Sequence, residues 1–133
     1  MIYLLDVNVL VALGVDQHQF NDRVSYWLES RAHDTFATCS MTELGCIRVL
    51  TQVAAYGFTV SQARTLLMQM KKSPLLSFSF LPDANDISHL PSWVKTPKQL
   101  TDGHLAELAK RNNAMLATLD EKISGSYLIP FFP

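Results

Sequence analysis

The sequence predicts a single α/β domain over residues 1–133, with an open parallel sheet and helices on both of its faces. Two observations predict it. Short apolar segments alternate along the chain with longer segments of helical periodicity, which is the pattern of parallel strands joined by helices. The composition, 48% hydrophobic and 17% charged over 133 residues, is that of one well-packed globular unit and not of a disordered or fibrous chain.

Five short segments are expected to form the strands of this sheet. Residues 2–6, IYLLD, are apolar on both faces, as a strand buried between two layers of helices should be. Residues 75–82, LLSFSFLP, alternate apolar side chains with serine, which also suits a strand. The other three predicted strands are residues 34–39, 115–120 and 126–132.

Four longer segments predict helices from the spacing of their apolar residues: about 20–32, 40–57, 59–74 and 100–114. Their ends carry recognisable signals. Gly57 is expected to stop the second helix, and Thr59 or Ser61 to open the third. The fourth helix is expected to end at Asn112–Asn113. A short helix followed by a loop is expected over residues 83–98, where prolines recur.

The charge balance and the cysteines exclude several classes of protein. The formal net charge is −1, so binding to nucleic acid would require Lys and Arg to be concentrated on one face. Cys39 and Cys46 are too few for a disulfide scaffold and do not resemble a metal-binding pair, so both are expected to be reduced core residues. No secretory leader or membrane-spanning segment is expected, which predicts a cytoplasmic location.

Four acidic residues stand at the ends of predicted elements. Asp6 and Asp120 each end a strand, and the carboxyl ends of parallel strands line the ligand crevice of an open sheet. Glu43 and Asp102 each lie in the first turn of a helix, on the stripe that carries its apolar residues, so both are expected to face inward. Four acids in comparable positions predict a shared site.

Each of these acids also has a purely structural interpretation. Residues 40–43 fit a capping box, in which Glu43 would serve only the helix backbone, and residues 118–121 fit the same pattern. Asp102 also suits a helix N-cap, and Asp6 also suits a turn. The sequence leaves these interpretations open for any one of the four, and the functional interpretation rests on their occurring together.

A cluster of ionised carboxylates needs a cation. Like charges within about 4–6 Å of one another disfavour ionisation, and a divalent ion removes that penalty. Mg²⁺ and Mn²⁺ prefer hard oxygen ligands and leave room for a phosphate, whereas zinc would call for His or Cys ligands. Such an ion lowers the pKa of a water and neutralises charge that develops on a phosphoryl group. The cluster therefore predicts metal-assisted hydrolysis of a phosphodiester bond.

The order of these motifs resembles that of PIN domains, and specifically of the VapC-type toxin ribonucleases of toxin–antitoxin systems. LLDVNVLVAL resembles the opening strand of the family, with Asp6 as the first acid and Asn8 as the polar residue that supports it. MTELGCIRVL resembles the segment that bears the second acid, Glu43, with Arg48 following on the same helix.

The last part of the chain resembles the C-terminal block of the same family. In LTDGHLAELAKRNNAMLATLDEKI, Asp102 opens the helix and Asp120 closes the next strand. Thr118 matches a small hydroxyl residue often found beside the last acid, whereas Leu119 stands where an aromatic residue is frequent. The resemblance extends over about residues 2–130, and the four motifs in this order are far more specific than any one of them.

The resemblance implies a parallel sheet of strand order 3-2-1-4-5, endoribonuclease activity that depends on Mg²⁺ or Mn²⁺, and a homodimer. It also implies a cognate VapB-type antitoxin that folds a C-terminal segment into the active-site groove. The catalytic and metal-binding residues that it implies are Asp6, Glu43, Asp102 and Asp120, with supporting roles for Asn8, Thr118 and Arg48.

Two other functions compete with the toxin nuclease. One is a catalytically inactive PIN-like module that binds RNA or a protein. The other is a haloacid-dehalogenase-like phosphatase, which also has an acid after its first strand but requires a second Asp where this chain has Asn8. Contacts to an RNA backbone are possible at five basic residues, each of which also fits an ordinary solvated charge: Lys95, Lys98, Lys110, Arg111 and Lys122.

Overall fold

The computed structural model describes all 133 residues and contains a five-stranded, entirely parallel sheet of order β3-β2-β1-β4-β5. This confirms the predicted α/β class and the strand order that the resemblance implies. The strands are β1 (Ile2–Leu5), β2 (Thr35–Thr38), β3 (Ser77–Phe80), β4 (Ala114–Thr118) and β5 (Tyr127–Leu128). The helices are α1 (Val7–Gly14), α2 (Asn21–Ser30), α3 (Ser40–Gln52), α4 (Val60–Lys71) and α5 (Leu100–Arg111), with 3₁₀ turns η1 (Ile87–His89) and η2 (Pro97–Gln99).

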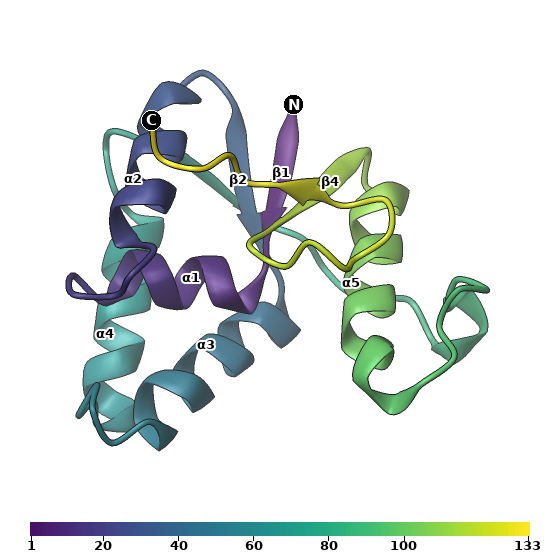
Figure 1. Ribbon diagram of the computed structural model, residues 1–133, viewed down its shortest axis with the longest axis horizontal. Coiled ribbons are helices and arrows are strands. Elements are labelled where there is room, and N and C mark those ends of the chain that lie inside the picture. Colours follow the sequence, from purple (N-terminus) through teal and green to yellow (C-terminus); the bar gives the residue numbers. More distant parts are fainter.

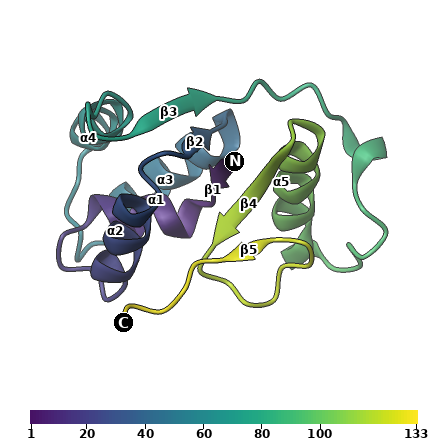
Figure 2. The ribbon, with the colours of Figure 1, turned by 90° about the horizontal axis from the view of Figure 1, so that it is seen from above.

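The sheet separates two apolar clusters. Successive side chains of a strand point to opposite faces, so Tyr3 and Leu5 pack on one face while Leu4 packs on the other. The face of Tyr3 and Leu5 is covered by α1, α2, α3 and α4, and the face of Leu4 is covered by α5. Figure 1 shows these two groups of helices on either side of the strands, and the view from above in Figure 2 shows the same division.

The helix α1 begins directly after β1 and was absent from the elements that the sequence predicts. Its central residues, Val9 to Ala12, are all buried, because α2, α3 and α4 pack around it. A helix whose centre is buried needs no polar stripe, and Asn8 is the only polar side chain of α1, so the 3.6-residue periodicity that marks a surface helix is missing. Asp6 is the N-cap of α1, and this position fixes the first predicted acid at the junction of strand and helix.

Two details of α3 differ from the prediction. The helix ends at Gln52 and not at Gly57. Its N-cap is Cys39, whose backbone N–H donates to the hydroxyl of Thr42 over 3.0 Å. The capping-box interpretation of Glu43 is therefore wrong, and the Glu43 carboxylate is available for other contacts. The short helix expected within residues 83–98 is the 3₁₀ turn η1.

Other predictions are confirmed. Cys39 and Cys46 are both buried and unbonded, and Thr59 caps α4 as expected. Asn112 follows α5, and Asn113 adopts a positive φ of 55°, which ends the helix. None of the helices combines the length and the apolar character that crossing a bilayer requires.

Candidate active site

Asp6 is held by two elements at once. Its Oδ1 accepts a hydrogen bond from the backbone N–H of Val7 at the start of α1, and its Oδ2 accepts one from the Thr118 hydroxyl at the end of β4, each over 2.8 Å. Only 6% of the residue is exposed. Both carboxylate oxygens are therefore satisfied, which offsets part of the cost of burying the charge and leaves the side chain little freedom to turn.

The hydroxyl of Thr118 connects the predicted site residues. It donates to Asp6, and it accepts hydrogen bonds from Asn8 Nδ2 over 3.2 Å and from the backbone N–H of Asp120 over 3.0 Å. Asn8 Oδ1 in turn accepts from the backbone N–H of Leu119 over 3.2 Å. Asn8 and Thr118 thus tie the end of β4 to the first turn of α1, and the network fixes the chain just before Asp120.

Three of the four predicted acids face one pocket. Asp6, Asp102 and Asp120 line a cavity of about 390 Å³. Asp102 reaches it from the first turn of α5, where no hydrogen bond holds its carboxylate. Asp120 lies two residues beyond β4, and its Oδ1 accepts from the backbone N–H of Lys122 over 2.9 Å. Neither Asp102 nor Asp120 caps a helix, so the structural interpretations of these two acids are wrong.

The surroundings of the pocket raise the pKa of two of its carboxylates. Burial raises the pKa of Asp6 and the charge of Asp120 raises it further, against the opposing effect of its two hydrogen bonds. Burial also raises the pKa of Asp102, and the charges of Asp6 and Asp120 add to this effect. No Lys or Arg lines the pocket. The pocket therefore concentrates negative charge that no basic side chain of its lining compensates.

Glu43 does not join these three acids. Its Oε2 accepts hydrogen bonds from the Thr38 hydroxyl and from Lys71 Nζ, each over 2.6 Å, and the residue is absent from the pocket lining. The ammonium group of Lys71 thus compensates the charge of Glu43. Glu43 in turn affects Cys46, because burial together with this charge raises the pKa of that thiol to about 12 and keeps it protonated.

Arg48, the remaining residue with a predicted supporting role, is exposed on α3 and forms no ion pair. Two side chains of the pocket that carry a titratable group, His18 and Tyr56, were not predicted as site residues. His18 and Tyr56 line it from the loops that follow α1 and α3. The ring Nδ1 of His18 accepts from the backbone N–H of Phe20 over 3.0 Å, and burial lowers the pKa of His18. Loop residues have no periodicity, so no sequence signal distinguishes them.

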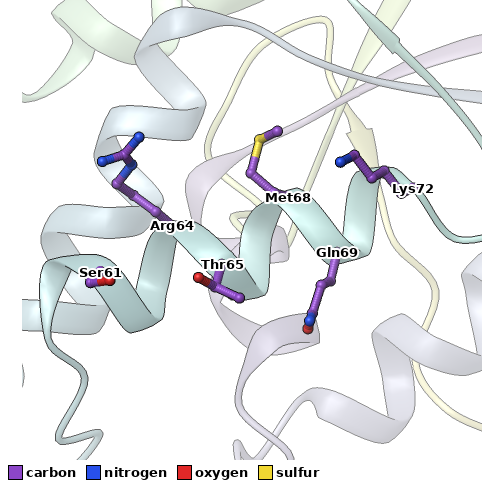
Figure 3. Close-up of a pocket in the computed structure, with 6 residues that line it drawn as sticks. All are labelled: Ser61, Arg64, Thr65, Met68, Gln69 and Lys72. Atoms are coloured by element: carbon purple, nitrogen blue, oxygen red, sulfur yellow. The ribbon is translucent and has the colours of Figure 1, made fainter.

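A second hollow, of about 380 Å³, lies on the outer face of α4. Figure 3 shows Arg64, Met68 and Lys72 extending along one side of this helix, with Thr65 and Gln69 along the other. The lining of this hollow contains two basic side chains, Arg64 and Lys72, and no acidic one. The hollow on α4 therefore lacks the carboxylates that a divalent cation prefers, whereas the pocket of Asp6, Asp102 and Asp120 contains three and is the candidate active site.

Comparison with known proteins places the chain in a family. A family model described as "PIN domain" matches residues 3–125. Ribonuclease VapC38 of Mycobacterium tuberculosis (strain ATCC 25618 / H37Rv) is 36% identical over 122 residues, which cover 88% of this chain and 84% of that protein. Ribonuclease VapC29 of the same strain is 36% identical over 126 residues, which cover 93% of this chain and 90% of that protein. The chain belongs to the VapC group of PIN-domain proteins.

A solved structure supports the fold of this PIN domain. The crystal structure of VapBC2 from Rickettsia felis bound to a DNA fragment from their promoter matches it with a TM-score of 0.64. The match covers 96% of this chain and 97% of the other chain at 19% sequence identity. The same architecture thus occurs in two sequences that share few residues.

The donor set of this PIN domain fits a hard divalent cation. The three acids of the pocket offer only carboxylate oxygens, which Mg²⁺ and Mn²⁺ prefer. The structure contains no group of three or more His, Cys, Asp or Glu side chains that are placed to hold a metal ion together, so these carboxylates would have to move to share one. Mg²⁺ commonly keeps several waters and needs only one or two carboxylates from the protein. Asp102, which no hydrogen bond restrains, is the carboxylate most free to move toward an ion.

Proposed function

We propose that this VapC-group protein is a Mg²⁺- or Mn²⁺-dependent endoribonuclease and the toxin of a type II toxin–antitoxin system. The observation that carries the proposal is the convergence of Asp6, Asp102 and Asp120 on one pocket that contains no Lys or Arg. These acids come from distant parts of the chain, and burial and mutual repulsion raise the pKa of Asp6 and of Asp102. The names of the M. tuberculosis relatives favour RNA as the substrate.

The side chains of the pocket have different tasks in this proposal. A bound Mg²⁺ or Mn²⁺ would supply an acidified water and neutralise charge on the phosphoryl group. Asp6, tied to Val7 and Thr118, keeps one wall of the pocket fixed. Asp102 and Asp120 complete the negative pocket that attracts the ion, and Asn8 holds the chain before Asp120 without adding charge.

Basic residues outside the pocket are proposed to hold the RNA backbone. Lys95, Lys98 and Lys122 are exposed and form no ion pair, so their charges are available to phosphates. Arg111 is engaged by Glu107 at 3.3 Å and is a weaker candidate. Arg48, also exposed, is proposed to assist at the phosphate or at the antitoxin.

We further propose that the toxin acts as a homodimer in the cytoplasm and is neutralised by a VapB-type antitoxin that enters the active-site groove. The VapBC2 complex supports an antitoxin partner by similarity of fold. An exposed apolar surface supports the dimer: Met41, Ile87, Leu90 and Leu100 contribute to a hollow of about 550 Å³, and Ile87 is 85% exposed. Apolar surface of this kind often marks a protein interface.

RNA cleavage tests the proposed function directly. Purified protein is incubated with structured RNA and Mn²⁺, with and without EDTA, beside an Asp102→Asn variant. We expect cleavage by the wild type that EDTA abolishes and that the variant lacks. Glu121→Gln is the matched control, since Glu121 is exposed next to Asp120 but does not line the pocket. RNA left equally intact by wild type and Asp102→Asn would instead support a binding module that does not cleave.

A further inference from the structure

The Glu43 carboxylate is bound on one oxygen by two donors from different elements. Thr38 lies at the end of β2 and Lys71 at the end of α4, and both donate to Oε2 over 2.6 Å. The side chains of Lys71 and Glu43 are only 23% and 22% exposed. A pair that is this short and largely shielded from water is screened less than a surface ion pair.

Lys71 has no competing carboxylate. No Asp or Glu occurs in the sequence between Glu43 and Asp83, and Glu43 is the only acid within ion-pair distance of Lys71. The ammonium group also lies 5.5 Å from the centroid of the Phe80 ring, which favours a cation. The surroundings of Lys71 therefore direct its ammonium group at Glu43.

The sequence motif and the geometry give Glu43 two incompatible positions. The motif MTELGCIRVL makes Glu43 the second acid of the family site, yet the pocket contains only Asp6, Asp102 and Asp120. Rotation of Oε2 toward that pocket would break both hydrogen bonds of Glu43. We propose that Lys71 is a positioning residue that acts as an internal counter-ion: it keeps Glu43 outside the carboxylate pocket and competes with a divalent cation for it.

This inference rests on the proposed metal-dependent function and makes a claim about metal affinity. In the metal-free protein Lys71 neutralises one of the four acids, so a cation that recruits Glu43 must first displace Lys71. Removing the Lys71 charge releases Glu43 and strengthens cation binding. The gain in affinity for the cation cannot exceed what the Lys71–Glu43 ion pair contributes. We expect the dissociation constant of the cation to fall roughly two- to fivefold.

Isothermal titration calorimetry with Mg²⁺ or Mn²⁺ alone tests the claim. Lys71→Met and Lys71→Gln should each bind the ion about two- to fivefold more tightly than the wild type, while Lys71→Arg should bind like the wild type. Lys72→Met is the matched control: it removes the same charge one residue away, from an exposed side chain that forms no ion pair. In a Glu43→Gln background, Lys71→Met should have no effect beyond that of Lys72→Met.

The outcomes separate this inference from the proposed function. Unchanged or weaker cation binding by both neutral variants would overturn the role of Lys71, even if the wild type cleaves RNA in an EDTA-sensitive manner. A gain equal to that of Lys72→Met, or one that persists in the Glu43→Gln background, would also overturn it. A wild type that neither binds the ion nor cleaves RNA would overturn the proposed function itself, and this inference with it.

Discussion

The hydroxyl of Thr118 donates to Asp6 Oδ2 over 2.8 Å, although 112 residues separate the two in the sequence. This hydroxyl also accepts from Asn8 and from the backbone of Asp120, so it uses its one proton and both lone pairs. Replacing it removes three hydrogen bonds from one point in the site.

Thr118→Val keeps the shape of the side chain but leaves Asp6, Asn8 and Asp120 each short of a partner. We expect a loss of about 1–3 kcal/mol in the free energy of unfolding, measured by urea denaturation, and a strong loss of RNA cleavage. Thr118→Ser retains the hydroxyl and should keep most of the stability and most of the RNA cleavage. Equal stability of the Val and Ser variants would contradict the role given to this hydroxyl.

Asp102→Asn should make the metal-free protein more stable at neutral pH. The carboxylate of Asp102 is repelled by Asp6 and Asp120 and accepts no hydrogen bond, so its removal relieves strain without breaking a contact. We expect the melting temperature in EDTA to rise by a few degrees. Added Mn²⁺ should then stabilise the wild type more than the variant, and a lower melting temperature of the variant in EDTA would refute the expectation.

The stability gap between Asp102→Asn and the wild type should depend on pH. The pKa of Asp102 is raised in the folded protein above its ordinary value of 3.8, so the folded state holds that proton more tightly than the unfolded state. Its stabilising contribution is present below pH 3.8 and is lost as the pH rises through the elevated pKa. In EDTA, melting curves from pH 3 to pH 7 should therefore show a gap that opens with rising pH.

Gly103 is required by the packing of α5 next to the site. A Cβ at this position would lie 2.2 Å from Val94 Cγ2 and 3.5 Å from the Pro91 ring, so Gly103→Ala must move the helix or the loop. We expect a loss of about 1–3 kcal/mol in stability and reduced cleavage, because Asp102 is the preceding residue. The double variant Gly103→Ala, Val94→Ala shortens the opposing Val94 side chain. It should recover much of the lost stability and of the lost cleavage. No recovery would show that steric conflict with Val94 is not the cause.

The apolar hollow beside η1 gives a test of the dimer. Ile87→Asp places a charge on the most exposed large apolar residue of this surface, and should convert a dimer to a monomer in light scattering after size exclusion. Ser124→Asp, at another exposed site, should leave the mass unchanged. An unaltered dimer in the Ile87 variant would exclude this surface as the interface.

Much of the fold was accessible from the sequence because its strands and surface helices have clear periodicities. The buried strand at residues 2–6 and the helix of Leu105 and Leu108 are confirmed within a few residues. The helix α1 was not predicted, since a helix whose centre is buried needs no polar stripe. The strand order came from the family resemblance and not from any local pattern.

The site was predicted in part. Asp6 and Asp120 follow adjacent strands, so sheet topology alone brings them together, and Asn8 and Thr118 connect the ends of these strands. Glu43 is bound outside the pocket by Lys71, which lies on another helix 28 residues away. A contact between side chains of two separate helices cannot be predicted from residue spacing or composition. The position of the loop residue His18 cannot be predicted from them either.

The position of Asp6 as N-cap of a helix whose centre is buried has a consequence for how such a domain can diversify. One wall of its pocket is anchored in the hydrophobic interior and cannot shift without disturbing the whole domain. The opposite wall, at the start of α5, includes the exposed Thr101 and the partly exposed Asp102, although Gly103 behind them is fixed by its packing. New ligand preferences can therefore evolve at exposed positions of that wall, such as Thr101, while the anchored acid stays in place.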